Sequence, residues 1–244
     1  MEVHHHAHTS RKRWTHYFWE FLMLFLAVFC GFLAEYQLEH IIEHQREKKY
    51  IISFIEDLKM DTTAIRENIE SKKEKIKTYD SLILFLSSKD PNQHGQSVYF
   101  YARKLTRGLS FFSTDRTIKQ LKNSGGLRLI TNQKASDSII AYEQAIERIY
   151  ITQLRQEDEL KNIQSLIGKL LDPLVLETMV EGENIIRPTG KPLLRTVNKE
   201  FLLDFIYDIH QLKGSDALNS VRLHRLQQRA TRIIYFLKTA YHLK

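Results

Sequence analysis

The chain has 244 residues, 43% of them hydrophobic and 27% charged, so it can form one globular domain with an appended segment and lacks the composition of a disordered protein. Its single cysteine, Cys30, excludes an intramolecular disulfide and a site built from several cysteines. The net charge of +7 does not indicate a nucleic-acid partner, because acidic and basic residues are mixed along most of the chain, as in residues 67–77, and no basic stripe interleaved with aromatics is evident.

Residues 1–16 form a basic, histidine-rich tail. Residues 11–13 are all basic and are suited to contact anionic lipid head groups. Neutral imidazoles bind transition metals, so the histidines of the tail are adventitious ligands, but without carboxylate or cysteine partners beside them they assign no metal or other cofactor. These histidines are His4, His5, His6 and His8.

Residues 17–36 are predicted to form a transmembrane helix. Residues 21–34 contain no polar side chain, and the apolar character extends to Tyr17 and Tyr36, which gives about 20 residues and roughly 30 Å of helix, the thickness of the hydrocarbon core. Trp14, Tyr17 and Trp19 on one side and Tyr36 on the other are typical interfacial aromatics.

Two other interpretations of this segment stay open. A cleaved signal peptide also begins with a basic stretch and an apolar run, but this run is longer than a typical signal core, and Phe32 stands where a small residue should precede cleavage after Ala34. The second alternative is a buried core helix of a soluble protein. We predict an uncleaved, single-pass anchor.

The distribution of basic residues predicts the orientation of the anchor. Basic residues 11–13 flank the segment closely on its N-terminal side, whereas Arg46, Lys48 and Lys49 lie about ten residues beyond its other end. The positive-inside rule therefore places the N-terminus in the cytoplasm. We expect an inner (cytoplasmic) membrane location with the C-terminal domain in the periplasm.

One side of the predicted transmembrane helix carries its small and charged residues. Spacings of three and four put them on a common face, and a small-xxx-small pair lets another helix approach closely, while a carboxylate facing lipid is costly. We expect this face to mediate homo-oligomerisation; the alternative is that the glutamate nearer the N-terminus reaches the interface and the small residues are incidental. The face consists of Glu20, Leu24, Ala27, Gly31, Ala34 and Glu35.

Residues 37–90 are predicted to form a long juxtamembrane helix that continues the transmembrane helix, because apolar residues recur at helical spacing until Pro91. From residue 51 the steps alternate between four and three if Thr62 and Lys72 occupy two positions of the apolar seam. The seam residues are Ile51, Ile55, Leu58, Thr62, Ile65, Ile69, Lys72, Ile76, Tyr79, Ile83 and Leu86.

Residues 91–244 are predicted to complete an elongated antiparallel helical bundle, so the fold class is all-α. A helix beginning at Ser113 or Thr114 ends at Gly125 and Gly126, and a second seam starts near Gln133. This second seam comprises Ile139, Tyr142, Ile146, Ile149, Gln153, Gln156, Leu160, Ile163, Ile167, Leu170 and Leu174.

The rest of the bundle is expected to contain a connector and two helices. Residues 180–197 hold two prolines and two glycines, which predicts an irregular connector with room for a short hairpin. Asn198 is the expected cap of a helix that ends at Gly214, and Ser215 is expected to begin the last helix.

The strongest pattern with a chemical meaning is HIIEH, at His40, Glu43 and His44. It matches the H-x-x-E-H arrangement in which two histidines bind zinc and the glutamate serves as base. Such enzymes need a third ligand and a substrate cleft, whereas this pattern lies within about a turn of the expected bilayer, so solvated side chains explain it better. A metal-dependent hydrolase stays as a remote alternative, and we predict that the chain is not an enzyme and has no catalytic, cofactor or metal site.

The segment WTHYFWEFLMLFLAVFCGFLAEYQLE together with LKNSGGLRLITN resembles an uncharacterised family of single-span membrane proteins from Bacteroidetes. The resemblance covers most of the chain and implies a membrane location, with no catalytic residues to transfer. We expect a membrane-anchored helical scaffold or sensor whose partners are the bilayer, copies of itself and another membrane protein. The alternative from a different class is an oligomeric pore or transport accessory protein lined by Glu20 and Glu35.

Overall fold

The computed structural model describes residues 14–243. The chain divides into two compact units, residues 1–49 and residues 50–244, and each unit is described by itself. Helix α1, Trp14–Leu86, contributes to both of them. The described residues are almost entirely helical, which confirms the predicted all-α class.

In the first unit, α1 carries the apolar segment expected to cross a membrane. By length and composition this helix can do so, and none of its apolar window is buried within the structure. The core helix of a soluble protein is, by contrast, mostly buried. Among residues 14–243 no second helix has this length and apolar character.

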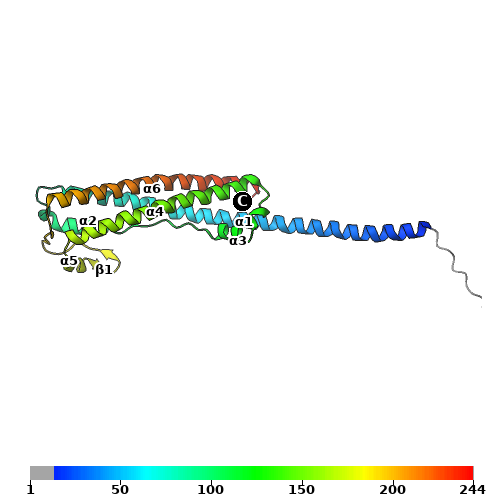
Figure 1. Ribbon diagram of the computed structural model, residues 1–244, viewed down its shortest axis with the longest axis horizontal. Coiled ribbons are helices and arrows are strands. Elements are labelled where there is room, and N and C mark those ends of the chain that lie inside the picture. The colour runs from blue at the N-terminus through cyan, green and yellow to red at the C-terminus, as the bar shows by residue number, and fades with distance from the viewer. Residues whose placement is uncertain (1–13, 244) are drawn as a thin grey trace, which may run out of the picture. The chain divides into compact units, whose positions relative to one another are not determined.

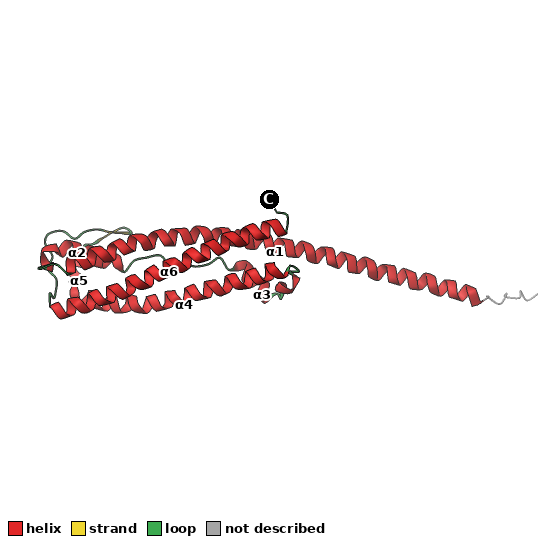
Figure 2. Cartoon of the chain, turned by 90° about the horizontal axis from the view of Figure 1, so that it is seen from above, coloured by secondary structure: helices red, strands yellow, loops and turns green. Residues whose placement is uncertain are grey.

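The second unit contains the remaining elements in the order η1 Pro91–His94, α2 Gly95–Leu105, α3 Arg116–Asn123, η2 Gly126–Leu129, α4 Gln133–Leu170, α5 Pro173–Glu177, strands β1 Val180–Glu181 and β2 Asn184–Ile185, and α6 Lys199–Ala240. Two views show α4 and α6 alongside the part of α1 that belongs to this unit (Figure 1, Figure 2). The two strands pair antiparallel and form the hairpin for which the connector had room.

Two contacts between α1 and α4 give the relative direction of these helices. Near the start of α4, the Tyr142 hydroxyl donates a 2.8 Å hydrogen bond to Asp61 of α1, and near its end Ile167 packs in the same core as Leu82. Helix α4 therefore runs parallel to α1, and α6 runs antiparallel to both, as in an antiparallel bundle whose successive passes alternate in direction. The physical reason is that residues 87–132, with two short helices, return the chain along the bundle before α4 begins.

The bundle has two apolar cores. The first core combines residues 51–69 of α1 with α3, the first half of α4 and residues 223–237 of α6. The second core combines residues 79–86 of α1 with α2, residues 163–171 and residues 202–212 of α6. The predicted seam of α1 faces these cores, and it includes the buried Lys72. In the second seam, Leu174 was wrongly included: it is 73% exposed and belongs to α5, which begins after α4 has ended.

The expected helix break at Gly214 and Ser215 does not occur, because α6 is continuous through both residues. The polar residues that suggested a new helix start are satisfied by other helices: Ser215 Oγ donates a 2.9 Å bond to Glu159 of α4, and Asp216 accepts a 2.7 Å bond from Lys72 of α1. The Asn198 side chain caps α6, as predicted, by accepting a 3.0 Å hydrogen bond from the Phe201 backbone N–H.

Two other predicted boundaries shift. Helix α1 ends at Leu86 rather than at the residue before Pro91, which instead begins the turn η1 with Asp90 as its cap. Helix α3 begins at Arg116, and Ser113 and Thr114 are not its cap. Instead, Asp57 of α1 accepts a hydrogen bond from a backbone N–H in the first turn of α3.

Candidate functional site

The predicted association face lies on α1 in the first unit. All six of its residues are exposed, namely Glu20, Leu24, Ala27, Gly31, Ala34 and Glu35. A Cβ atom added to Gly31 would meet no atom within 4 Å, so the backbone of a neighbouring helix has room to approach there. The structure describes one copy of the chain, and association through this face stays a prediction.

The HIIEH residues are exposed side chains of α1. His40, Glu43 and His44 all belong to this one helix, and the His44 imidazole lies 3.5 Å from a carboxylate oxygen of Glu47. Between residues 14 and 243, no three His, Cys, Asp or Glu side chains are grouped to hold a metal ion. The histidines of the tail lie outside the described residues.

A buried polar layer separates the two cores of the bundle. Asp216 of α6 is 2% exposed and stands at its centre. One carboxylate oxygen accepts a 2.7 Å bond from Lys72 Nζ and a 3.0 Å bond from Gln156 Nε2, and the other accepts from the Tyr79 hydroxyl and lies 3.5 Å from Lys75 Nζ. All three long helices contribute to this layer, and its carboxylate is fully engaged.

The electrostatics of the polar layer favour an ionised Asp216. Burial by itself would raise the pKa of this carboxyl, but the ammonium groups of Lys75 and Lys72 and their hydrogen bonds hold it below its ordinary value. Burial lowers the pKa of Lys75, and the negative charge of Asp216 offsets only part of that decrease. Burial and the neighbouring carboxylate raise the pKa of Tyr79, so its hydroxyl stays protonated and donates. This arrangement ties α1, α4 and α6 together through one buried carboxylate.

Two buried aspartates of α1 hold the start of α3 and the residues just before it. Asp57 accepts a 3.0 Å bond from the Thr117 backbone N–H and a 2.6 Å bond from Arg116 Nε. Asp61 accepts a 2.6 Å bond from the Thr114 backbone N–H. Burial raises the pKa of Asp61, and the bonds from Thr114 and Tyr142 oppose that rise. Because Asp115 makes no side-chain cap bond of its own, tertiary contacts define the start of α3.

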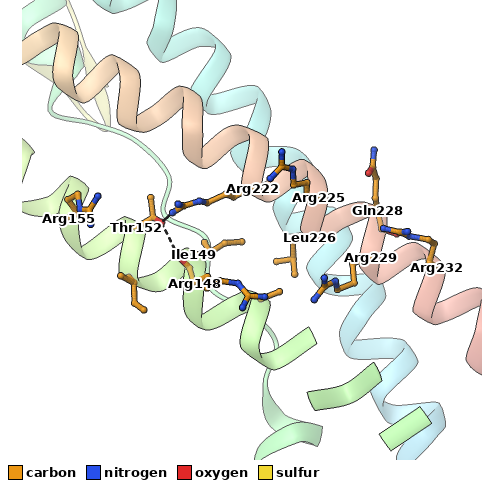
Figure 3. Close-up of a pocket in the computed structure, with 12 residues that line it drawn as sticks. Arg148, Ile149, Thr152, Arg155, Arg222, Arg225, Leu226, Gln228, Arg229 and Arg232 are labelled. Atoms are coloured by element: carbon orange, nitrogen blue, oxygen red, sulfur yellow. Dashed lines mark hydrogen bonds between the residues drawn. The ribbon is translucent and has the colours of Figure 1, made fainter. Parts of the chain in front are cut away.

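A further candidate is a groove of about 550 Å³ between α4 and α6, drawn in Figure 3. Its base is apolar, because it is formed by Ile149 and Leu226. Both side chains belong to the first core and are 2% exposed. Six arginines surround this base, and we call the feature the arginine groove. They are Arg148 and Arg155 of α4 and Arg222, Arg225, Arg229 and Arg232 of α6.

No carboxylate lines the arginine groove. Within residues 14–243, none of the six guanidinium groups forms an ion pair. Two of them are held across the groove: Arg222 donates to Thr152 Oγ1, as Figure 3 shows, and Arg229 donates a 2.8 Å bond to the Ala141 carbonyl. The groove is thus a concentrated positive site.

Sequence reasoning missed this groove, although two signals were present. The α6 arginines recur at steps of three, four and three, which puts them on one helical face. The residues after Asp216 contain no Asp or Glu but six Lys or Arg, so the mixture of charges found elsewhere ends there. Only the packing of α4 against α6 adds Arg148 and Arg155 opposite them.

No protein-family model, curated protein or solved structure matches the chain.

Proposed function

We propose that this protein is a non-enzymatic, membrane-anchored helical module that acts as a scaffold or a sensor. The observation that carries the proposal is the exposed apolar segment of α1, next in the chain to a bundle that has its own two cores. Exposure to water of side chains such as Phe21, Leu24 and Phe25 forgoes about 1.5–3 kcal/mol each relative to burial. A bilayer removes that cost for the whole segment.

Extraction from membranes tests the anchor. Alkaline carbonate should leave the intact chain in the pellet, and the mass of the membrane-bound protein should include residues 1–34, because an uncleaved anchor keeps its N-terminus. Release of the full-length chain into the supernatant would refute the anchor. A mature chain that begins near Glu35 would identify a signal peptide instead.

The proposed orientation has the N-terminus in the cytoplasm and the bundle in the periplasm of a cell with an inner membrane. It is supported by the basic residues 11–13 before the apolar segment. A C-terminal alkaline phosphatase fusion should be active, because this enzyme needs an oxidising compartment, while a C-terminal green fluorescent protein fusion should be dark. The reverse pair of results would invert the orientation.

Self-association of the anchor is the second part of the proposal, and Cys30 makes it testable because it is the only cysteine. In a Cys30→Ser background, Ala27→Cys places a thiol on the association face, and Phe29→Cys places one about 200° around the same helix, on its far side. Oxidation in native membranes should crosslink the first variant and not the second, because a disulfide needs Cβ atoms about 3.5–4.5 Å apart. Equal crosslinking of both would mean random collision.

The scaffold and the sensor differ in what they do with a ligand. A scaffold keeps the same set of crosslinked partners whether or not a ligand is bound. A sensor changes the crosslinking yield of Ala27→Cys when the bundle is occupied, since a ligand shifts an equilibrium only through different affinities for its two states. Comparing this yield with and without the ligand considered in the next subsection separates the two.

A further inference from the structure

The arginine groove has the composition of an anion-binding site. We propose that it binds the phosphate chain of an oligophosphate compound, either a free polyphosphate or the phosphate chain of a nucleotide. This inference concerns the bundle alone, so it does not depend on the membrane anchor or on its orientation.

The dimensions of the groove fit a linear small molecule. Its volume of about 550 Å³ is that of an ordinary ligand site. Arg148 and Arg155 are seven residues apart, or about 10 Å along α4, and Arg222 and Arg232 are ten residues apart, or about 15 Å along α6. Successive guanidinium groups on α6 therefore follow each other by about one helical turn, and a chain of phosphates lying between the helices would meet donors from both.

The number of charges favours phosphates over carboxylates. The groove presents six guanidinium groups and no carboxylate, so a ligand that balances them must carry several negative charges in a small volume. A chain of three phosphates does this, whereas a peptide with the same charge needs a longer segment. Guanidinium also matches phosphate oxygens with two parallel hydrogen bonds, which a lysine cannot provide.

The groove is partly organised before any ligand binds. Arg222 and Arg229, both half-buried, are fixed by bonds to Thr152 and to the Ala141 carbonyl on the opposite helix. Each guanidinium has five N–H donors, so these bonds leave others for a ligand. The apolar base formed by Ile149 and Leu226 lowers the local dielectric, which strengthens both the mutual repulsion of the arginines and their attraction to an anion. A bound oligophosphate removes the repulsion.

Calorimetric titration of the full chain in a non-ionic detergent with sodium tripolyphosphate, without divalent cations, tests the proposal. We expect one bound tripolyphosphate per chain, with weaker binding at higher salt. At a hundredfold excess over Kd the melting temperature of the bundle should rise by about 5 to 10 °C, because ligand binding to the native state adds directly to stability.

Variants locate the binding. The triple variant Arg148→Gln, Arg225→Gln and Arg232→Gln changes three exposed groove residues and should weaken binding at least tenfold. The control Arg66→Gln, Lys169→Gln and Lys199→Gln removes the same number of charges from exposed positions outside the groove and should change Kd less than twofold. Lysine at the three groove positions keeps the charge and should still weaken binding, since the paired hydrogen bonds are lost.

Other anions distinguish the sources and can overturn the proposal. Tighter binding of ATP than of tripolyphosphate would identify a nucleotide as the ligand, and equal or weaker binding would identify the free chain. The proposal is overturned if citrate or hexaglutamate binds as tightly as tripolyphosphate, if the control triple variant loses as much affinity as the groove variant, or if the lysine variant binds normally. No heat of binding and no rise in melting temperature would also overturn it.

Discussion

Replacing Asp216 with asparagine removes the one negative charge of the polar layer while keeping its shape. The Asp216 and Lys72 side chains are only 3% and 8% exposed, so the substitution leaves a buried ammonium without its counterion. Losing one partner of a buried ion pair costs about 3–5 kcal/mol. For a unit of this size that corresponds to a melting temperature lower by roughly 6 to 20 °C.

Thermal and urea unfolding followed by far-ultraviolet circular dichroism measure this loss on the full chain in detergent. Asp80→Asn is the matched control, because Asp80 pairs with Lys213 between the same two helices but is 58% exposed. Such an exposed pair contributes about 0–1 kcal/mol. If Asp216→Asn destabilises the bundle no more than Asp80→Asn does, the polar layer is not held by its buried charge and the reasoning is refuted.

The pH dependence gives an independent check of the same charge. The folded-state pKa of Asp216 lies below its ordinary value, so its stabilising contribution is complete above the unfolded pKa of about 3.9 and is lost as the pH falls through the lower folded value. The stability difference between the wild type and Asp216→Asn should therefore be constant from about pH 5 to 7 and shrink below about pH 4. A difference that persists unchanged under acid would show that charge is not its cause.

Three further substitutions have expected outcomes. Gly214→Ala should raise the unfolding free energy by about 0.5–1 kcal/mol in urea titrations, because Gly214 lies inside α6 and an added Cβ meets nothing within 4 Å. Gly95→Ala should lower the melting temperature by several degrees, because the added Cβ would lie 2.0 Å from the Pro192 carbonyl oxygen. An unchanged melting temperature would show that the connector around Pro192 moves aside without cost. Asp57→Ala should cost about 1–2 kcal/mol and speed hydrogen exchange at the Thr117 amide, and unchanged exchange there would exclude Asp57 as the cap of α3.

The sequence by itself determined the apolar segment of α1 and the helical class, because both depend on local information. The length of an unbroken apolar run can be read directly against the thickness of a bilayer, and steps of three and four put residues on one helical face whatever packs against them. Even the polar position of Lys72 in the seam followed from this spacing, and Lys72 is buried where the period predicts.

Only the tertiary structure decided which polar residues end a helix and which face another one. Gly214, Ser215 and Asp216 have the composition of a helix start, yet α6 continues through them because α1 and α4 supply their hydrogen-bond partners. Likewise, α4 runs parallel to α1 because residues 87–132 return the chain along the bundle, and neither apolar seam by itself determines this direction. The arginine groove is of the same kind: its charges are in the sequence, but the opposing wall exists only because α4 packs against α6.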